Sequence, residues 1–442
     1  MSHLTATVLG DVALVILVSW AFGAAARRLG QPTVIGQILA GIALGPTLLG
    51  RIPGDPSGHL FPEDARPFLS MLAQVAIVLF MFVAGYEMDF RAFRAGRTAV
   101  GVAAAGLLAP MALAVGAVAL FGGAFSAVDP GHADQGSFAM YVAVAVSITA
   151  LPVLAAIVRE RGAAGTPAGT VSIAAAGFMD VAAWLVLAAV LSDSGQATRF
   201  SWPVALGLLA AFTAFLFLAV RPLLRGWLDR PATLLSNPVP AAMILALGSA
   251  WVTESLGLHA VFGGFLAGLA MPRREGRPSA DVLGPMEQTS GMLLPLFFVS
   301  TGLSVDIGSL GGDGFGLLAL ILLIAIAGKF VPAYGAARLG GLDSRQSSLV
   351  AVMVNTRGLT ELIVLDVGRS AGLIGQDLYA VLVLMALVTT FMTGPLLQLV
   401  GKERKGRPAD SARTSTSTTS THSAEPAEPA GPGGERTGEK SA

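Results

Sequence analysis

The sequence predicts an all-α polytopic membrane protein with about thirteen transmembrane helices. Hydrophobic residues make up 54% of the 442 residues, charged residues make up only 13%, and mean hydropathy is +0.70. Soluble domains carry about 25% charged residues. Apolar runs long enough to cross a bilayer recur from residue 8 to residue 400. We therefore expect residues 1–401 to form one transmembrane domain.

The apolar runs divide into thirteen candidate spans, of which the ninth is short. Alanine and glycine are abundant in them, and small residues let helices approach closely in lipid. The expected spans are 8–26, 34–50, 68–89, 97–121, 138–158, 170–192, 202–224, 239–256, 258–271, 286–305, 315–338, 346–368 and 377–400.

The basic residues of the loops predict the orientation. Loops after odd-numbered spans, together with the start of the tail, carry nineteen Lys and Arg residues, whereas the opposite loops carry four. The positive-inside rule then places the N-terminus outside and the C-terminus in the cytoplasm of a multi-pass cell-membrane protein. The first run lacks a basic segment before it and a cleavage site after it, so we interpret it as a span. Residues 402–442 are rich in Pro, Gly, Ser and Thr, which predicts a disordered cytoplasmic tail.

Composition also excludes several functional classes. Cysteine is absent, so disulfides and thiol chemistry are excluded, and the five histidines lack the spacing of metal ligands. A net charge of zero gives no reason to expect nucleic acid as a partner. No Ser/His/Asp set and no phosphate-binding glycine loop is present. We expect no bound metal, no cofactor and no enzyme activity.

An internal repeat links spans that lie seven apart. Val34–Pro46 of span 2 resembles Val261–Pro272 of span 9, and Leu79–Phe90 of span 3 resembles Leu296–Ile307 of span 10. Seven is odd, so the related spans run in opposite directions. An inverted-topology repeat of this kind is a recurring plan of secondary transporters.

Spans 5 and 12, also seven apart, each contain helix-breaking residues near the middle. Span 5 has Thr149 and Pro152, and span 12 has Asn355, Arg357 and Gly358. Proline removes a backbone donor and glycine weakens a helix. Two broken helices at corresponding positions of two halves point to a substrate site, although each break is also compatible with a simple kink.

Asp180 lies at the midpoint of the apolar run Val171–Leu191, about 15 Å from either face of a bilayer core. A charged, unpaired carboxylate is costly at this depth and usually functional. A lone carboxylate among carbonyl and hydroxyl oxygens suits a hard monovalent cation. Because burial also favours the protonated form, a proton and a cation can compete for one site. We hypothesise that Asp180 binds H⁺ or Na⁺/K⁺, with Thr149 as a neutral oxygen ligand.

Three further ionisable residues lie deep in the spans. Lys329 is nine residues before Arg338, about 13 Å by helical rise, which is far for a lysine that extends to the membrane surface. We interpret Lys329 as a compensating charge. Arg357 and Glu361 have i, i+4 spacing, which fits a structural ion pair as well as a role in transport.

The motifs resemble the monovalent cation:proton antiporter-2 family, which includes Kef-type and Nap-type bacterial antiporters and plant cation/proton exchangers. The resemblance concerns the membrane domain and extends over about residues 10–400 in family order. The matching stretches are QPTVIGQILAGIALGPTLLG, VLFMFVAGYEMD, SITALPVLAAIVRERG, FMDVAAWLVLA, LGLHAVFGGFLAGLAMP, LLPLFFVSTGLSVDI and VNTRGLTELIVLDVG.

The resemblance implies a sodium/proton exchanger fold in which a core domain of crossed, broken helices accompanies a dimerisation domain. It further implies a homodimer that works by elevator-type alternating access. Asp180 matches the family's ion-binding aspartate, Thr149 and Pro152 match its first broken helix, and Lys329 matches its core lysine. Many members have Asp or Asn where this chain has Met179. We therefore expect one proton to be exchanged per cation.

Three other functions are weighed against a cation:proton antiporter. A proton-coupled exporter of an organic or ionophore-like solute would use the same fold, and Met179 makes its site more apolar. A membrane-embedded enzyme would need clustered acid/base or metal-binding residues, which the sequence lacks. A channel would not need an inverted repeat around a buried aspartate. Spacing alone does not choose between Na⁺ and K⁺.

Overall fold

A computed structural model describes residues 2–88, 96–129, 135–163, 165–193, 202–228 and 237–402. Over these ranges the chain is helical and contains no strand beyond one isolated bridge between Arg274 and Arg277. Nine helices in the described ranges are long and apolar enough to cross a membrane. The all-helical, multi-pass prediction is therefore confirmed. The predicted disordered tail lies outside the described residues, apart from its first residue.

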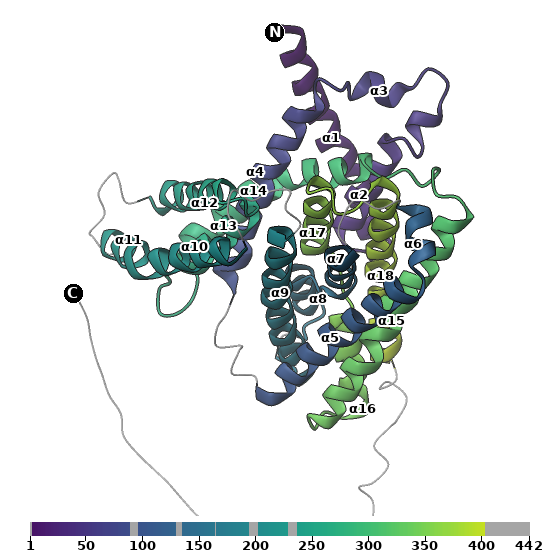
Figure 1. Cartoon of the computed structure of the whole chain (residues 1–442). Helices are drawn as coiled ribbons and strands as arrows, with labels where there is room; N and C mark the ends of the chain where they lie inside the picture. The colour runs from purple at the N-terminus through teal and green to yellow at the C-terminus, as the bar shows by residue number, and fades with distance from the viewer. Residues whose placement is uncertain are drawn as a thin grey trace, which may run out of the picture. The chain divides into compact units, whose positions relative to one another are not determined.

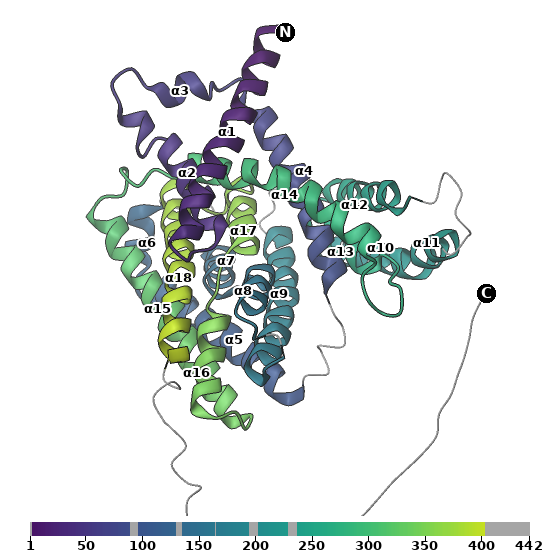
Figure 2. The same ribbon diagram turned by 180° about the vertical axis from the view of Figure 1, so that it is seen from behind.

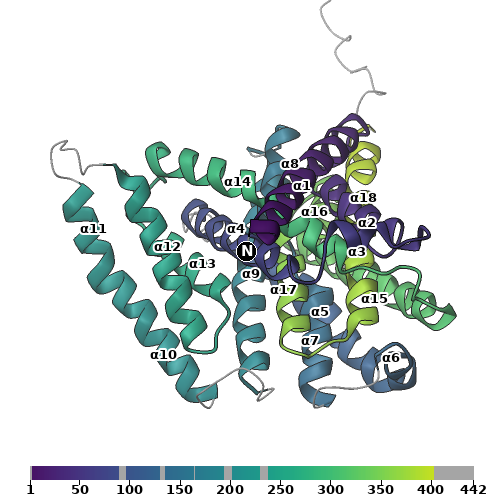
Figure 3. The same ribbon diagram turned by 90° about the horizontal axis from the view of Figure 1, so that it is seen from above.

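One group of helices packs around α4 and α14 (Figure 1). This first helix group also includes a π-helical turn between α10 and α11. Its members are α1 (Ser2–Arg28), α2 (Thr33–Leu44), α3 (Pro56–Leu60), α4 (Arg66–Glu87), α10 (Trp202–Phe215), the turn Leu216–Val220, α11 (Arg221–Leu228), α12 (Pro238–Ser255), α13 (Ala260–Ala270) and α14 (Ala280–Leu303). Seen from above, α10, α12 and α13 lie on one side of α9 (Figure 3).

The second helix group packs around α5, α9 and α15, and α10 of the first group contacts α9. Its members are α5 (Gly96–Leu120), α6 (Gly122–Val128), α7 (Gln135–Ser147), α8 (Leu151–Glu160), α9 (Pro167–Asp193), α15 (Gly312–Leu339), α16 (Ser344–Val354), α17 (Leu359–Ser370) and α18 (Gln376–Lys402). Helices α7, α8 and α17 lie in the middle of this group, and α16 lies at its lower end in Figure 2. Their side chains are largely buried, so polar atoms in them are shielded from solvent.

The packing of the first group follows the sequence repeat. Helix α2 packs on α14, and α13 packs on α4. A Cβ atom on Gly302 would lie 2.6 Å from the backbone nitrogen of Ile42, and one on Gly85 would lie 3.2 Å from the backbone nitrogen of Leu269. In the repeat Gly302 corresponds to Gly85, and Ile42 to Leu269. The same close helix contact therefore occurs twice, and it needs glycine both times because backbones touch.

Both predicted helix breaks are present in the second group. Residues 148–150 separate α7 from α8, and residues 355–358 separate α16 from α17. Pro152 is the second residue of α8, where a backbone N–H has no intrahelical partner, so proline is tolerated there. Each break leaves helix-end carbonyl and N–H groups inside the protein, and these groups need partners.

Candidate functional site at the crossing of two interrupted helices

The two breaks contact each other directly. The Thr149 hydroxyl donates a hydrogen bond to the backbone oxygen of Val354 at 2.8 Å, and the Ala150 N–H donates to the backbone oxygen of Thr356 at 3.2 Å. Val354 is the last residue of α16, so the hydroxyl satisfies a carbonyl that the helix itself leaves unpaired. The interrupted helices therefore cross at their breaks.

Gly358 makes this close crossing possible. A Cβ atom at Gly358 would lie 2.5 Å from Cγ2 of Val153 and 3.5 Å from Cβ of Ala150. The missing side chain thus lets the start of α17 pass against α8. Neighbouring Asn355 is the residue that ends α16, and it is completely buried.

Asp180 on α9 faces the start of α8. Its side chain is buried, and its Oδ2 accepts a hydrogen bond from the Leu151 N–H at 3.3 Å. Leu151 is the first residue of α8, and the N-terminal end of a helix carries partial positive charge. Asp180 Oδ1 has no hydrogen-bond partner among the residues that the structure describes. The carboxylate therefore has one oxygen held by the broken helix and one without a hydrogen-bond partner.

Met179 contributes packing where many members of the resembled family have a polar residue. Its sulfur lies 3.1 Å from the Thr149 hydroxyl oxygen, and a Cβ atom on Gly106 would lie 2.6 Å from its Cε. Thioether sulfur is a weak acceptor, so the single hydroxyl proton of Thr149 goes to the backbone oxygen of Val354. Met179 thus fills the space against α5 and supplies no oxygen ligand.

Lys329 of α15 is completely buried and binds the end of α7. Its Nζ donates to the backbone oxygens of Ser147 at 2.5 Å and Ile148 at 2.9 Å. It forms no ion pair with Asp180. The ammonium therefore satisfies carbonyls that the broken helix exposes, at a helix end that carries partial negative charge.

Arg357 binds the same helix end as Lys329. It donates to the backbone oxygen of Ala145 at 3.0 Å and to that of Val146, and it pairs with Glu361 at 2.9 Å. Both side chains of this ion pair are fully buried. The ion pair that the i, i+4 spacing predicts is therefore present, and it is combined with a cap on α7.

The structure brings all the predicted site residues to one place. The positively charged side chains of Lys329 and Arg357 bind the C-terminal end of α7, and the N-terminal end of α8 faces Asp180. The oxygens around the crossing come from a carboxylate, hydroxyls and backbone carbonyls, which are the ligands of hard cations. Within the described ranges no group of three or more His, Cys, Asp or Glu could hold a metal ion.

Sequence reasoning missed three residues. Thr356 lies in the second break, completely buried. Trp184, one turn beyond Asp180, packs edge-on against Phe262 of α13 with ring centroids 5.2 Å apart, so it joins the two helix groups. Asp11 in α1 is buried, although it lies near the start of a span. Threonine and tryptophan are common in membrane helices, so neither Thr356 nor Trp184 stands out in the sequence. Asp11 could have been recognised, because an acidic residue inside an apolar run is unusual.

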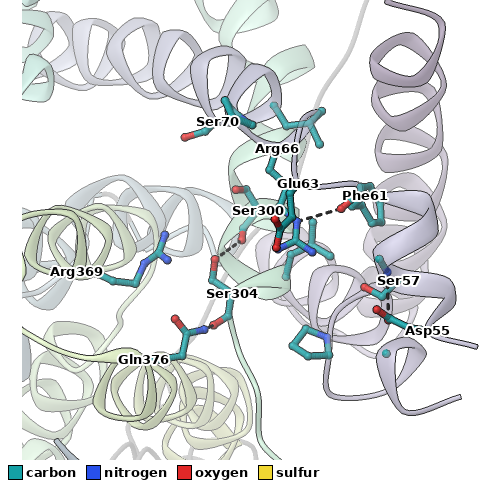
Figure 4. A pocket seen from close by; sticks show the side chains of 16 residues that line it. Asp55, Ser57, Phe61, Glu63, Arg66, Ser70, Ser300, Ser304, Arg369 and Gln376 are labelled. Atoms are coloured by element: carbon teal, nitrogen blue, oxygen red, sulfur yellow. Dashed lines mark hydrogen bonds between the residues drawn. The ribbon is translucent and has the colours of Figure 1, made fainter. Parts of the chain in front are cut away.

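A separate cavity of about 660 Å³ lies at the ends of α2, α4, α14 and α17. Figure 4 shows Gln376 and Arg369 on one side of Ser304, and Arg66 and Glu63 on the other. The Gln376 amide donates to the backbone oxygen of Ser304. None of the predicted ion-site residues is among the described residues that line this cavity.

A helical membrane protein with two interrupted helices crossing beside a buried carboxylate has the architecture of a secondary transporter. Residues 12–402 match the family model described as sodium/hydrogen exchanger, transmembrane. The chain belongs to this family of exchangers. The resemblance to cation:proton antiporters seen in the sequence is confirmed.

Two relatives illustrate the match. Cation/H(+) antiporter 19 of Arabidopsis thaliana is 36% identical over 395 residues, which cover 86% of this chain and 48% of that protein. Na(+)/H(+) antiporter NhaS4 of Synechocystis is 32% identical over 397 residues, which cover 88% of this chain and 96% of that protein. The chain thus spans about half the length of the plant relatives it matches and nearly all of the cyanobacterial one.

The fold also resembles a solved structure. The sodium proton antiporter MjNhaP1 of Methanocaldococcus jannaschii superimposes with a TM-score of 0.59 at 14% identity, covering 91% of this chain and 99% of that chain. At this identity the likeness concerns the fold alone.

Proposed function

We propose that the protein exchanges a monovalent cation, Na⁺ or K⁺, for H⁺ across the cytoplasmic membrane. Asp180 binds the cation and the proton competitively, and Thr149 belongs to the same site. The observation that carries this proposal is the buried carboxylate whose Oδ2 is held by the Leu151 N–H while its Oδ1 is unpartnered. Either a proton or a cation neutralises this group, which lowers the cost of moving it through an apolar interior.

Lys329 and Arg357 fit this role as fixed charges. Both are bonded to carbonyls of α7, so neither has to leave Asp180 when a ligand binds there. Because Met179 replaces a second acidic or amide residue, one carboxylate serves both ligands. A proton and a monovalent cation then give the loaded site the same charge, so exchange is one for one and electrically silent.

The movement that we propose is elevator-type alternating access in a homodimer. The second helix group carries the site, and it moves against the first helix group, which provides the dimer contact. The paired contacts of Gly302 with Ile42 and Gly85 with Leu269 support an inverted-topology repeat. We further propose thirteen spans with the N-terminus outside and the C-terminus in the cytoplasm, as the basic loops indicate.

Everted vesicles with an imposed pH gradient test the exchange activity. Na⁺, K⁺ and Li⁺ are added in turn to vesicles holding the wild type, Asp180→Asn or Asp11→Asn. We expect at least one cation to collapse the gradient in the wild type and none to do so in Asp180→Asn. Asp11→Asn, which alters a buried carboxylate of α1 outside the crossing, should keep the activity.

The possible outcomes test the exchange activity and the role of Asp180 separately. If no cation collapses the gradient in the wild type, cation:proton exchange is rejected. If Asp180→Asn transports normally, Asp180 is not the binding residue. Proton flux in the wild type that responds only to an organic or ionophore-like solute would favour the exporter, for which fully buried Met179 provides an apolar wall.

A further inference from the structure

The second helix break contains two polar side chains whose hydrogen-bonding atoms are unused. Asn355 and Thr356 are both 0% exposed. Neither the amide oxygen and nitrogen of Asn355 nor the hydroxyl of Thr356 has a hydrogen-bond partner among the described residues. Buried amides and hydroxyls are normally paired, so adjacent residues that both lack partners call for an explanation.

These side chains lie at the same crossing as Asp180. Two consecutive residues of the first break bind the backbone on either side of Asn355. The Thr149 hydroxyl donates to the backbone oxygen of Val354 at 2.8 Å, and the Ala150 N–H donates to that of Thr356 at 3.2 Å. The next N–H, that of Leu151, binds Asp180 Oδ2 at 3.3 Å. Successive Cα atoms are only about 3.8 Å apart, so one short stretch connects Asn355 and Thr356 with the carboxylate.

The backbone of the second break is well satisfied, which makes the side chains stand out. The backbone oxygen of Val354, just before the break, accepts from the Thr149 hydroxyl, that of Thr356 accepts from the Ala150 N–H, and that of Arg357 accepts from the Thr390 hydroxyl at 3.0 Å. Asp180 Oδ1, Asn355 Oδ1 and Thr356 Oγ1 are unpaired side-chain oxygens at the crossing, and Thr360 Oγ1 and Glu361 Oε2 are unpaired in the first turn of α17. One carboxylate oxygen with two neutral oxygens is a suitable partial ligand set for a dehydrated alkali cation.

We propose that Asn355 Oδ1 and Thr356 Oγ1 bind the transported cation together with Asp180, and that they help to select which cation is carried. This inference rests on the proposed cation:proton exchange and adds the residues that distinguish its two ligands. A proton needs only the carboxylate, whereas a cation that has lost its water needs several oxygens. Removing the neutral oxygens therefore weakens cation binding and leaves proton binding at Asp180 unchanged.

The test uses near-isosteric variants, Asn355→Leu and Thr356→Val, with Ser172→Ala as the matched control. Ser172 is also completely buried with an unpartnered hydroxyl, and it lies eight residues before Asp180 on α9, about 12 Å by helical rise. Apparent KM values for Na⁺, K⁺ and Li⁺ are measured in everted vesicles holding the full chain. The pH profile is recorded at saturating cation.

We expect each variant to raise the apparent KM of the preferred cation about tenfold, as loss of one ligand oxygen implies. The preference among the three cations should change, and the pH profile should keep its wild-type form. Asn355→Ser, which restores an oxygen, should bring the KM part of the way back. Ser172→Ala should leave both measurements unchanged.

Two negative results have different meanings. Wild-type protein that exchanges no cation overturns the proposed function and this inference together. Wild-type exchange combined with unchanged KM values and preference in Asn355→Leu and Thr356→Val, whatever happens to maximal rate, overturns this inference alone. If Asn355→Leu does not reach the membrane, Thr356→Val and Asn355→Ser decide by the same criteria.

Discussion

Lys329 Nζ lies 2.5 Å from the backbone oxygen of Ser147, so this buried ammonium is bonded to a helix end and not to a carboxylate. Its second acceptor is the backbone oxygen of Ile148 at 2.9 Å. Charge compensation at the crossing is therefore directed at the C-terminal end of α7 and acts on Asp180 from a distance.

Replacing Lys329 by methionine should destabilise the protein, because two buried carbonyls lose a charged donor. We expect a loss of about 2–4 kcal/mol, measured as a lower thermal unfolding midpoint of the purified protein in detergent. Lys329→Arg, which keeps the charge, should lose less. Equal unfolding midpoints for wild type and Lys329→Met would contradict a capping role.

The Arg357–Glu361 pair predicts a strongly non-additive response. Arg357→Met leaves a fully buried carboxylate without its partner, so it should cost about 3–5 kcal/mol. The double variant Arg357→Met/Glu361→Gln should recover part of this loss, because no unpaired charge remains. A double-mutant cycle on unfolding midpoints measures the coupling, and additive effects would rule out a stabilising pair.

The sequence predicted the breaks better than it predicted their bonding. Proline, glycine and polar residues inside apolar runs are visible signals, and both breaks lie where Pro152 and Gly358 indicated. The carbonyl partners of Lys329 were not predictable, because every residue has a carbonyl and only the crossing exposes those at Ser147 and Ile148.

Burial decides which polar residues are candidates for the ion site, and burial depends on packing between segments that are distant in the sequence. Thr356 looks like any membrane-helix threonine until the crossing encloses it. Asp11 was overlooked because it lies near the start of its span, yet α1 packs so that its carboxylate is buried. The family resemblance supplied the crossing itself, which spacing along one chain does not reveal.

The duplicated glycine contact predicts matched effects in the two halves of the first helix group. Gly302→Ala would bring Cβ to 2.6 Å from a backbone atom of Ile42, so the helices must separate. We expect Gly302→Ala and Gly85→Ala each to destabilise the protein by about 1–3 kcal/mol.

A glycine with open space provides the control for these variants. A Cβ atom at Gly316 in α15 would meet nothing within 4 Å, so Gly316→Ala should be neutral or slightly stabilising. Thermal unfolding in detergent compares all three variants. A neutral result at either Gly302 or Gly85 would show that the two contacts are not equivalent.

Met179 predicts the electrical character of transport. It supplies no oxygen and packs its Cε near Gly106, so Asp180 is the carboxylate that faces the start of α8, whereas Glu361 is paired with Arg357. One carboxylate that holds either one proton or one monovalent cation moves the same charge in both directions.

Wild-type exchange should therefore produce no current in voltage-clamped vesicles, and Met179→Leu, which keeps the volume, should behave alike. Met179→Asp adds a second proton carrier and should make exchange electrogenic. A clear transport current in the wild type or in Met179→Leu would exclude one-for-one exchange.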